Sequence, residues 1–260
     1  MTTTISADGT DIAYSTLGKG PALLLVDGAL CSRAFGPMPG YAKLLAEHFT
    51  VYWYDRRGRG ESGDTKPHAV QREIEDLAAM VKVTGEAPFV LGTSSGAALA
   101  LQGAAAGVPM RKLLMYEAPY VPVPAGGKSA AQHTDRLWEL VRNDERGAAV
   151  HYFMCDVVGM PSVMGYLFRL FPMWGKLKKV AHTLPYDLSI LADVGFLESG
   201  ARKVTVPTMV AGGAKSPEAL KEAVRRVHAA VPGSTLHWVE GATHNLQPAP
   251  AVAMMREWFR

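Results

Sequence analysis

The chain has 260 residues, of which 48% are hydrophobic and 20% are charged, and its formal net charge is +3. This composition predicts a soluble globular enzyme, built as one large α/β domain or as such a domain with a lid. The small net charge without a dense basic run argues against a nucleic-acid partner, and the apolar runs are too short to span a bilayer.

Up to residue 120, strand patterns alternate with helix patterns. The chain opens with a hairpin, because two segments alternate polar and apolar residues around the turn at Asp8-Gly9. The continuously apolar run 22–26 predicts a strand buried on both faces. In order, we expect strands 3–6, 12–17 and 22–26, a helix within 35–49, strand 51–54, helix 70–84, strand 89–91, a helix ending near 107 and strand 112–116.

This alternation predicts a mostly parallel sheet that is flanked by helices on both faces. In such sheets, ligands bind beyond the carboxyl ends of the strands. Asp27, Ser94 and Glu117 each stand at the end of a predicted strand, so we expect them at one edge of the sheet.

Residues 121–192 show a different pattern. They begin with a stretch rich in proline and glycine and continue with helical patterns only, over 129–142, 145–158, 162–171 and 173–183. Methionine and aromatic residues are dense here and would mostly pack the core of this segment. As a lid inserted after the sixth strand, the segment would also place an apolar pocket, with Met154 as a candidate, over Ser94.

The sheet pattern then returns, with strand 208–211, helix 218–230, strand 235–239 and helix 252–259. We therefore expect a core α/β domain formed by residues 1–120 and 193–260, interrupted by a helical lid at 121–192.

The motif Gly92-Thr93-Ser94-Ser95-Gly96 follows a predicted strand and precedes an Ala-rich helix. A serine on so tight a turn needs tiny neighbours, and the turn lifts its hydroxyl clear of the sheet while the Ser95 N–H faces the reacting carbonyl. A plain Gly/Ser loop would show the same letters. The strand before it and the helix after it favour a nucleophile at Ser94.

A serine hydroxyl needs a base, usually a histidine, and the imidazolium that forms needs a carboxylate. Of the eight histidines, only His244 lies in a Gly-flanked loop after the last strand. His151 falls in the predicted lid, His237 lies inside a strand pattern, and the others have strongly polar neighbours. We therefore predict His244 as the base.

Three motifs together resemble those of the α/β-hydrolase superfamily. Residues 54–62 resemble the loop after its fourth strand, 92–96 its nucleophile elbow and 240–244 its histidine loop. The resemblance covers nearly the whole chain outside the predicted lid. It implies an α/β-hydrolase fold and a triad of serine, acid and histidine in that order along the chain.

The sequence departs from this superfamily at the acid. Most members carry it after the seventh strand, where residues 212–216 hold none before Glu218. The other known position is the end of the sixth strand, where Glu117 stands. We predict Glu117 as the acid; the alternatives are Glu218 in that role or a structural role for Glu117.

A second departure is Asp27-Gly28, where the superfamily usually has His-Gly. The oxyanion donor there is a backbone group, so the N–H of Gly28 or Ala29 can still pair with that of Ser95. Asp27 is expected either to bond its own loop or to line the substrate pocket.

The Asp-Gly turn, the Ser-Ser elbow and the early glutamate are similar to the fungal zearalenone lactonases, which open a resorcylic macrolactone. This similarity implies a bulky ester or lactone substrate, and it makes Trp174 a candidate pocket residue.

These features predict a serine hydrolase that cleaves a small-molecule carboxylic ester or lactone through Ser94, His244 and Glu117, with an acyl-enzyme intermediate. The same triad can serve C–C bond hydrolysis or a cofactor-free perhydrolase. A non-hydrolytic ligand-binding protein on the same fold is a third alternative. No cofactor, metal or membrane partner is expected, and the chain is expected to be a monomer or homodimer.

The location follows from the cysteines and the first residues. Cys31 and Cys155 are far apart and form no metal-binding or redox spacing, as is typical of reduced thiols in the cytoplasm. Residues 1–4 have no feature of a signal peptide. We therefore expect a cytoplasmic protein.

Overall fold

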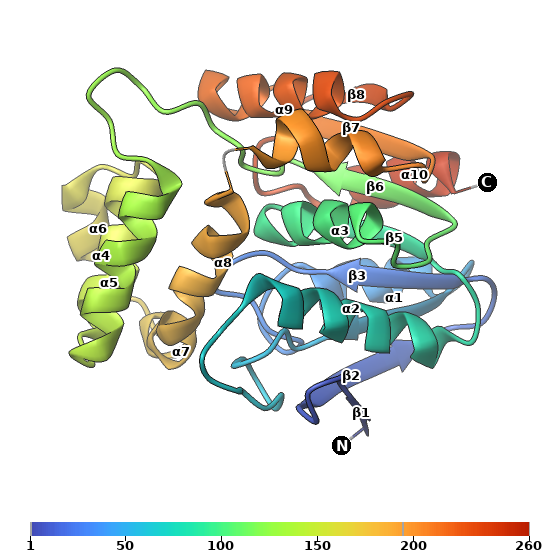
Figure 1. Ribbon diagram of the computed structural model, residues 1–260, viewed down its shortest axis with the longest axis horizontal. Coiled ribbons are helices and arrows are strands. Elements are labelled where there is room, and N and C mark those ends of the chain that lie inside the picture. Colours follow the sequence, from blue (N-terminus) through green and yellow to red (C-terminus); the bar gives the residue numbers. More distant parts are fainter. Residues whose placement is uncertain (1, 194, 260) are drawn as a thin grey trace.

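The computed structural model describes residues 2–193 and 195–259, and it has a central eight-stranded sheet with helices on both faces (Figure 1). The strand order is β1-β2-β4-β3-β5-β6-β7-β8. The bounds are β1 (Thr2–Ile5), β2 (Asp11–Leu17), β3 (Ala22–Val26), β4 (Thr50–Tyr54), β5 (Phe89–Thr93), β6 (Lys112–Tyr116), β7 (Thr208–Gly213) and β8 (Thr235–Val239). This confirms the predicted α/β-hydrolase fold with a mostly parallel sheet.

The direction of the strands follows from their connections. β1 and β2 form the predicted antiparallel hairpin, and β2 pairs antiparallel with β4. The remaining neighbours pair in parallel. Every residue of β3 and β5 is buried, as expected for apolar strands that are covered on both faces. The carboxyl ends of the parallel strands therefore lie along one edge of the sheet.

Two layers of helices cover the sheet (Figure 1). One face carries α2 (Val70–Thr84), α3 (Ser95–Ala105) and α9 (Glu218–Ala230), whose apolar residues share one core cluster with the strands. The other face carries α1 (Met38–Leu45) and α10 (Pro248–Trp258), whose apolar residues form a second cluster. The sheet is thus a rigid platform with a core on each side.

A group of helices lies between β6 and β7, beyond the carboxyl ends of the parallel strands (Figure 1). We call residues 130–191 the helical insertion. Its elements are α4 (Ala130–Arg142), α5 (Arg146–Tyr152), the π-helical turn η1 (Phe153–Val157), α6 (Ser162–Phe168), α7 (Trp174–Val180), the 3₁₀ turn η2 (Ala181–Thr183) and α8 (Leu184–Leu191). Two short turns, η3 (Phe196–Gly200) and η4 (Ala201–Lys203), lead back to the sheet.

Helix α8 joins the insertion to the core. Its Leu184 and Leu188 belong to the apolar cluster of the insertion, whereas its Ile190 belongs to the core cluster beneath α3. The sequence analysis did not predict this helix, because Pro185 interrupts the pattern. In the structure Pro185 lies in the first turn, where its missing N–H would have had no partner in the helix.

Several helices have other bounds than their predicted ranges; α6, for example, ends at Phe168 rather than at 171. α1 (Met38–Leu45) lies within the predicted range 35–49, and the residues before it form a small bridge between Phe35 and Ser32. α10 begins at Pro248, four residues before the predicted start at 252, and again a proline occupies the first turn. In the part of the chain that the structure describes, no helix is both long and apolar enough to cross a membrane.

Candidate active site

Ser94 lies between β5 and α3 on a strained turn. Its φ of +53° and ψ of −127° are unusual for a residue with a side chain. A Cβ atom on Gly96 would overlap the carbonyl oxygen of Val26, and one on Gly92 would overlap the backbone of Ala97. Only glycine fits at these two positions, so the local sequence allows the turn that leaves Ser94 half-buried.

Ser94 and Glu117 occupy equivalent positions on neighbouring strands. Thr93 and Tyr116 are partners in the parallel register of β5 and β6, and each is followed by one of the two residues. The Ser94 N–H donates to the Tyr116 carbonyl at 2.9 Å. Strand pairing therefore fixes the distance between the two backbones.

Glu117 is fully buried, and both of its carboxylate oxygens have partners. Oε1 accepts the Gly213 N–H at 2.8 Å, and Oε2 lies 2.7 Å from Nδ1 of His244. Burial by itself would raise the pKa of Glu117, but the hydrogen bond from His244 and that from Gly213 outweigh it and lower the pKa below its usual value. The carboxylate is thus held in its ionised form beside the histidine.

The loop that carries His244 is fixed by two tyrosines. The Tyr116 hydroxyl donates to the Thr243 carbonyl at 2.6 Å, and the Tyr41 hydroxyl donates to the Leu246 carbonyl at 2.8 Å. The His244 side chain is 38% exposed. With Nδ1 directed to Glu117, Nε2 is the nitrogen left for proton transfer.

The structure places the alternative acid, Glu218, away from His244. It lies at the start of α9, is 66% exposed, and pairs with Lys221 at 2.7 Å and Arg225 at 2.8 Å. Those surface pairs occupy its carboxylate. The geometry therefore associates His244 with Glu117 rather than with Glu218.

The turn after β3 lies against the elbow. A Cβ atom on Gly28 would lie 2.9 Å from the Ser94 Cβ. The Gly28 N–H donates to Oδ1 of Asp27 at 2.8 Å, whereas the Ala29 N–H has no acceptor within residues 2–193 and 195–259. Ser95 is the first residue of α3, so its N–H has no acceptor within the helix. The N–H groups of Ser95 and Ala29 are thus both without an acceptor among the described residues.

Asp27 itself is 6% exposed. It bonds its own loop, which is one of the two roles expected for it from the sequence. The Thr93 hydroxyl also lies 3.5 Å from its Oδ1. Burial raises the pKa of Asp27 from 3.8 to about 6, although the Gly28 N–H lowers it in part. Burial thus holds the pKa of this carboxyl, in the turn after β3, above its usual value.

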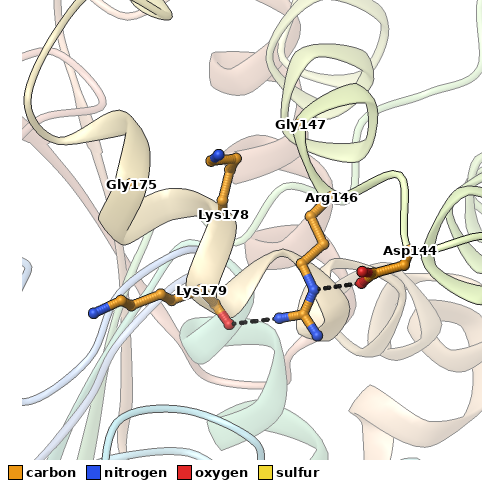
Figure 2. Close-up of a pocket in the computed structure, with 6 residues that line it drawn as sticks. All are labelled: Asp144, Arg146, Gly147, Gly175, Lys178 and Lys179. Atoms are coloured by element: carbon orange, nitrogen blue, oxygen red, sulfur yellow. Dashed lines mark hydrogen bonds and ion pairs between the residues drawn. The ribbon is translucent and has the colours of Figure 1, made fainter.

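The candidate pocket residues Met154 and Trp174 pack at the edge of the apolar cluster of the insertion. The same cluster includes Leu30 and reaches Ala29, so the insertion packs directly against the turn after β3. A separate surface pocket lies between α5 and α7, and it is lined by Asp144, Arg146, Gly147, Gly175, Lys178 and Lys179 (Figure 2). None of these six is a predicted site residue.

The sequence analysis missed a set of buried charges beneath the site. Arg56 and Arg59 follow β4, and Asp187 lies on α8; each is at most 2% exposed. Asp187 pairs with both arginines at 2.7 Å. The arginines lie in the motif that resembles the superfamily loop, but their partner lies on the helix that was not predicted. Among the described residues, no group of His, Cys, Asp and Glu is arranged to hold a metal ion.

Comparison with known proteins gives matches along the chain. The model of the alpha/beta hydrolase family matches residues 23–256. The uncharacterized hydrolase YraK of Bacillus subtilis (strain 168) is 32% identical over 102 residues, which are 38% of this chain and 37% of that protein. This chain therefore spans little more than a third of that curated relative.

Two solved structures extend the comparison. An alpha/beta hydrolase from Sphaerobacter thermophilus DSM 20745 is 40% identical, with 100% of both chains covered and a TM-score of 0.91. A thermophilic esterase from Thermogutta terrifontis, with malate bound, is 22% identical over 100% of this chain and 97% of its own, with a TM-score of 0.73. The second likeness shows a shared fold.

Proposed function

The chain belongs to the alpha/beta hydrolase family, and we propose that it is a serine hydrolase that cleaves a carboxylic ester or lactone. The observation that carries the proposal is the 2.7 Å contact between Nδ1 of His244 and Oε2 of the buried Glu117, next to a serine on a strained turn. A buried carboxylate that holds a histidine in this way is the pair that activates a serine hydroxyl within its reach.

In the proposed mechanism, His244 takes the proton of the Ser94 hydroxyl as its oxygen attacks the carbonyl carbon. Glu117 stabilises the imidazolium that forms and fixes its tautomer. The oxyanion accepts hydrogen bonds from the N–H groups of Ser95 and Ala29. We assign Ala29 rather than Gly28, because the Gly28 N–H is already donated to Asp27.

The second half of the reaction returns the enzyme to its starting state. The imidazolium gives its proton to the leaving alkoxide, and an acyl-enzyme remains on Ser94. His244 then deprotonates a water, which attacks the acyl carbon; the bond to the Ser94 oxygen breaks, the imidazolium returns the proton to that oxygen, and the acid is released. With a lactone substrate the alcohol stays tethered, so the product is a hydroxy acid.

We propose further that residues 121–192 act as a lid that shapes the substrate pocket. The support is the position of the helical insertion beyond the carboxyl ends of the strands (Figure 1) and its apolar cluster, which reaches Leu30 and Ala29. Met154 and Trp174 at the edge of this cluster would favour bulky apolar or aromatic acyl groups.

The test is hydrolysis of p-nitrophenyl esters of increasing chain length and of a small lactone panel, with wild type beside Ser94→Ala. We expect turnover by the wild type and a loss of about 10³-fold or more in the variant. A fluorophosphonate probe should label the wild type and leave Ser94→Ala unlabelled. Full activity in Ser94→Ala would remove the assigned nucleophile.

A further inference from the structure

One carboxylate joins the helical insertion to both sides of the proposed oxyanion hole. Asp187 of α8 is 1% exposed. Its Oδ1 lies 2.7 Å from Nη1 of Arg56 and accepts the Ser95 hydroxyl at 2.7 Å, while its Oδ2 lies 2.7 Å from Nη2 of Arg59. Three donors from two separate segments of the core thus converge on a side chain of the insertion.

The two arginines also bond the turn after β3, residues 27–29, which we call the oxyanion turn because it carries the proposed donor Ala29. Arg59 donates through Nη1 to the Gly28 carbonyl at 2.6 Å. Arg56 donates through Nη1 to the Asp27 carbonyl at 3.4 Å and to the Ser95 hydroxyl at 3.3 Å. The Gly28 carbonyl belongs to the peptide whose N–H is that of Ala29. The Ser95 N–H therefore belongs to a residue whose hydroxyl bonds Asp187, and the Ala29 N–H belongs to a peptide whose carbonyl bonds Arg59, a partner of Asp187.

The arginines of this cluster have further buried partners. Arg56 also pairs with Glu73 at 2.7 Å, and Glu73 is 1% exposed. Arg56 thus lies between two buried carboxylates, and Glu73 also lies 3.2 Å from His68. Such a set holds a well-defined geometry only while every member has its partner, because an uncompensated buried charge is strongly unfavourable. A hydrogen bond from a charged arginine to a backbone carbonyl is also shorter and stronger than one from a neutral donor.

We propose that Asp187 is a positioning residue for the oxyanion hole, which through Arg56, Arg59 and the Ser95 hydroxyl fixes the separation of the Ser95 and Ala29 N–H groups. The inference rests on the proposed function, since an oxyanion hole serves acyl transfer. Oxyanion donors act only when they lie about 2.7–3.1 Å from the developing charge. Because Asp187 comes from α8, a fast chemical step then requires that the insertion packs correctly against the core.

The experiment compares Asp187→Asn with a matched control, Asp76→Asn. Asp76 is also buried, and it pairs with Arg57 of the same loop through contacts of 2.8 and 2.7 Å. The contacts of Arg57 are with Asp8, Arg72 and Asp76, away from the oxyanion turn. Both variants replace a buried carboxylate by an amide and are expected to lose stability. Only Asp187 contacts groups that bond the segments carrying the proposed donors.

We expect Asp187→Asn to lower kcat for ester hydrolysis by about 10- to 100-fold with little change in KM, the pattern of a lost transition-state interaction. Binding of a boronic acid, which forms a tetrahedral adduct on serine, should weaken by a similar factor, and so should the rate of fluorophosphonate labelling. Asp76→Asn should stay within about twofold of wild type in all three measurements.

Ser95→Ala provides a second variant in case Asp187→Asn does not fold. It keeps the backbone N–H and removes only the hydroxyl between Asp187 and Arg56, so we expect a smaller fall in kcat, about 3- to 10-fold. A kcat unchanged in Ser95→Ala, or lowered equally in Asp187→Asn and Asp76→Asn, would overturn the positioning role. Full activity in Ser94→Ala would instead overturn the proposed function, so the two failures are distinct.

Discussion

The sheet edge and the helical insertion form the two sides of the proposed site, and they are built differently. At the sheet edge, Glu117 is fully buried and the backbones of Ser94 and Glu117 are fixed by strand pairing. In the insertion, α6 and the residues after it expose large apolar side chains, with Val163 at 71% and Leu170 at 81%. We thus assign the chemical step to the buried sheet edge, and the selection of substrate to the helical insertion with its exposed apolar side chains.

This difference has a physical reason. A triad and an oxyanion hole must keep their groups within fractions of an ångström, which buried strands and charge-assisted bonds can do. A pocket for apolar groups needs apolar contact area, which does not depend on exact bond angles. Methionine-rich helices provide such an area in an adaptable form. Changes at the sheet edge should therefore alter turnover, whereas changes on the outside of the insertion should alter little.

The largest effect in this comparison is expected for Glu117→Gln. The amide cannot stabilise the imidazolium and can favour the wrong tautomer of His244, so kcat should fall by about 10²- to 10⁴-fold. Steady-state hydrolysis of a p-nitrophenyl ester measures it, with circular dichroism to show that the variant is folded.

The matched control is Glu218→Gln, which removes the charge of an exposed carboxylate on α9. It should leave kcat within about twofold of wild type, as for other surface substitutions. If Glu218→Gln lost activity and Glu117→Gln kept it, the acid would belong after the seventh strand, where most of the superfamily carries it.

The sheet edge was largely predictable from the sequence because its signals are local. The glycines around Ser94 mark the strained turn, and the polar residues that end apolar strands mark the carboxyl edge. The register that brings Glu117 beside Ser94 follows once the two strands are taken as parallel neighbours. Local patterns therefore carry most of the fold and the candidate triad.

The buried charge cluster was not predictable in this way. A run of arginines after a strand is typical of an exposed loop, and nothing near Arg56 in the sequence indicates that its partner is Asp187. The pairing depends on how α8 packs, and α8 itself was not predicted because Pro185 interrupts its helical pattern. Long-range polar contacts of this kind depend on tertiary structure and leave no periodic pattern.

A smaller effect is expected from pH at Asp27. The folded protein keeps this carboxyl protonated up to about pH 6, whereas the unfolded chain loses the proton near its ordinary pKa of 3.8. The native state therefore binds more protons between these values, so the contribution of Asp27 to the free energy of unfolding falls as the pH rises through this window. Above pH 6 the loss is complete.

The measurement is urea unfolding of wild type and Asp27→Asn at several pH values from about 4.5 to 7.5. Relative to Asp27→Asn, wild type should lose about 1–3 kcal/mol of stability across this range, since one unit of pKa corresponds to about 1.4 kcal/mol. The comparison with the variant removes the contribution of Glu117, whose lowered pKa has the opposite sign. Parallel curves for the two proteins would mean that Asp27 is ionised throughout.

The smallest effect should come from the outer surface of the insertion. Leu170→Ala removes a side chain that is 81% exposed, so the free energy of unfolding should stay within about 0.5 kcal/mol of wild type. Leu140→Ala makes the same chemical change in α4, where the side chain is 2% exposed, and should cost about 2–5 kcal/mol. Urea unfolding measures both. A large loss in Leu170→Ala would mean that this surface is covered in solution, and the insertion would then be as tightly packed as the sheet edge.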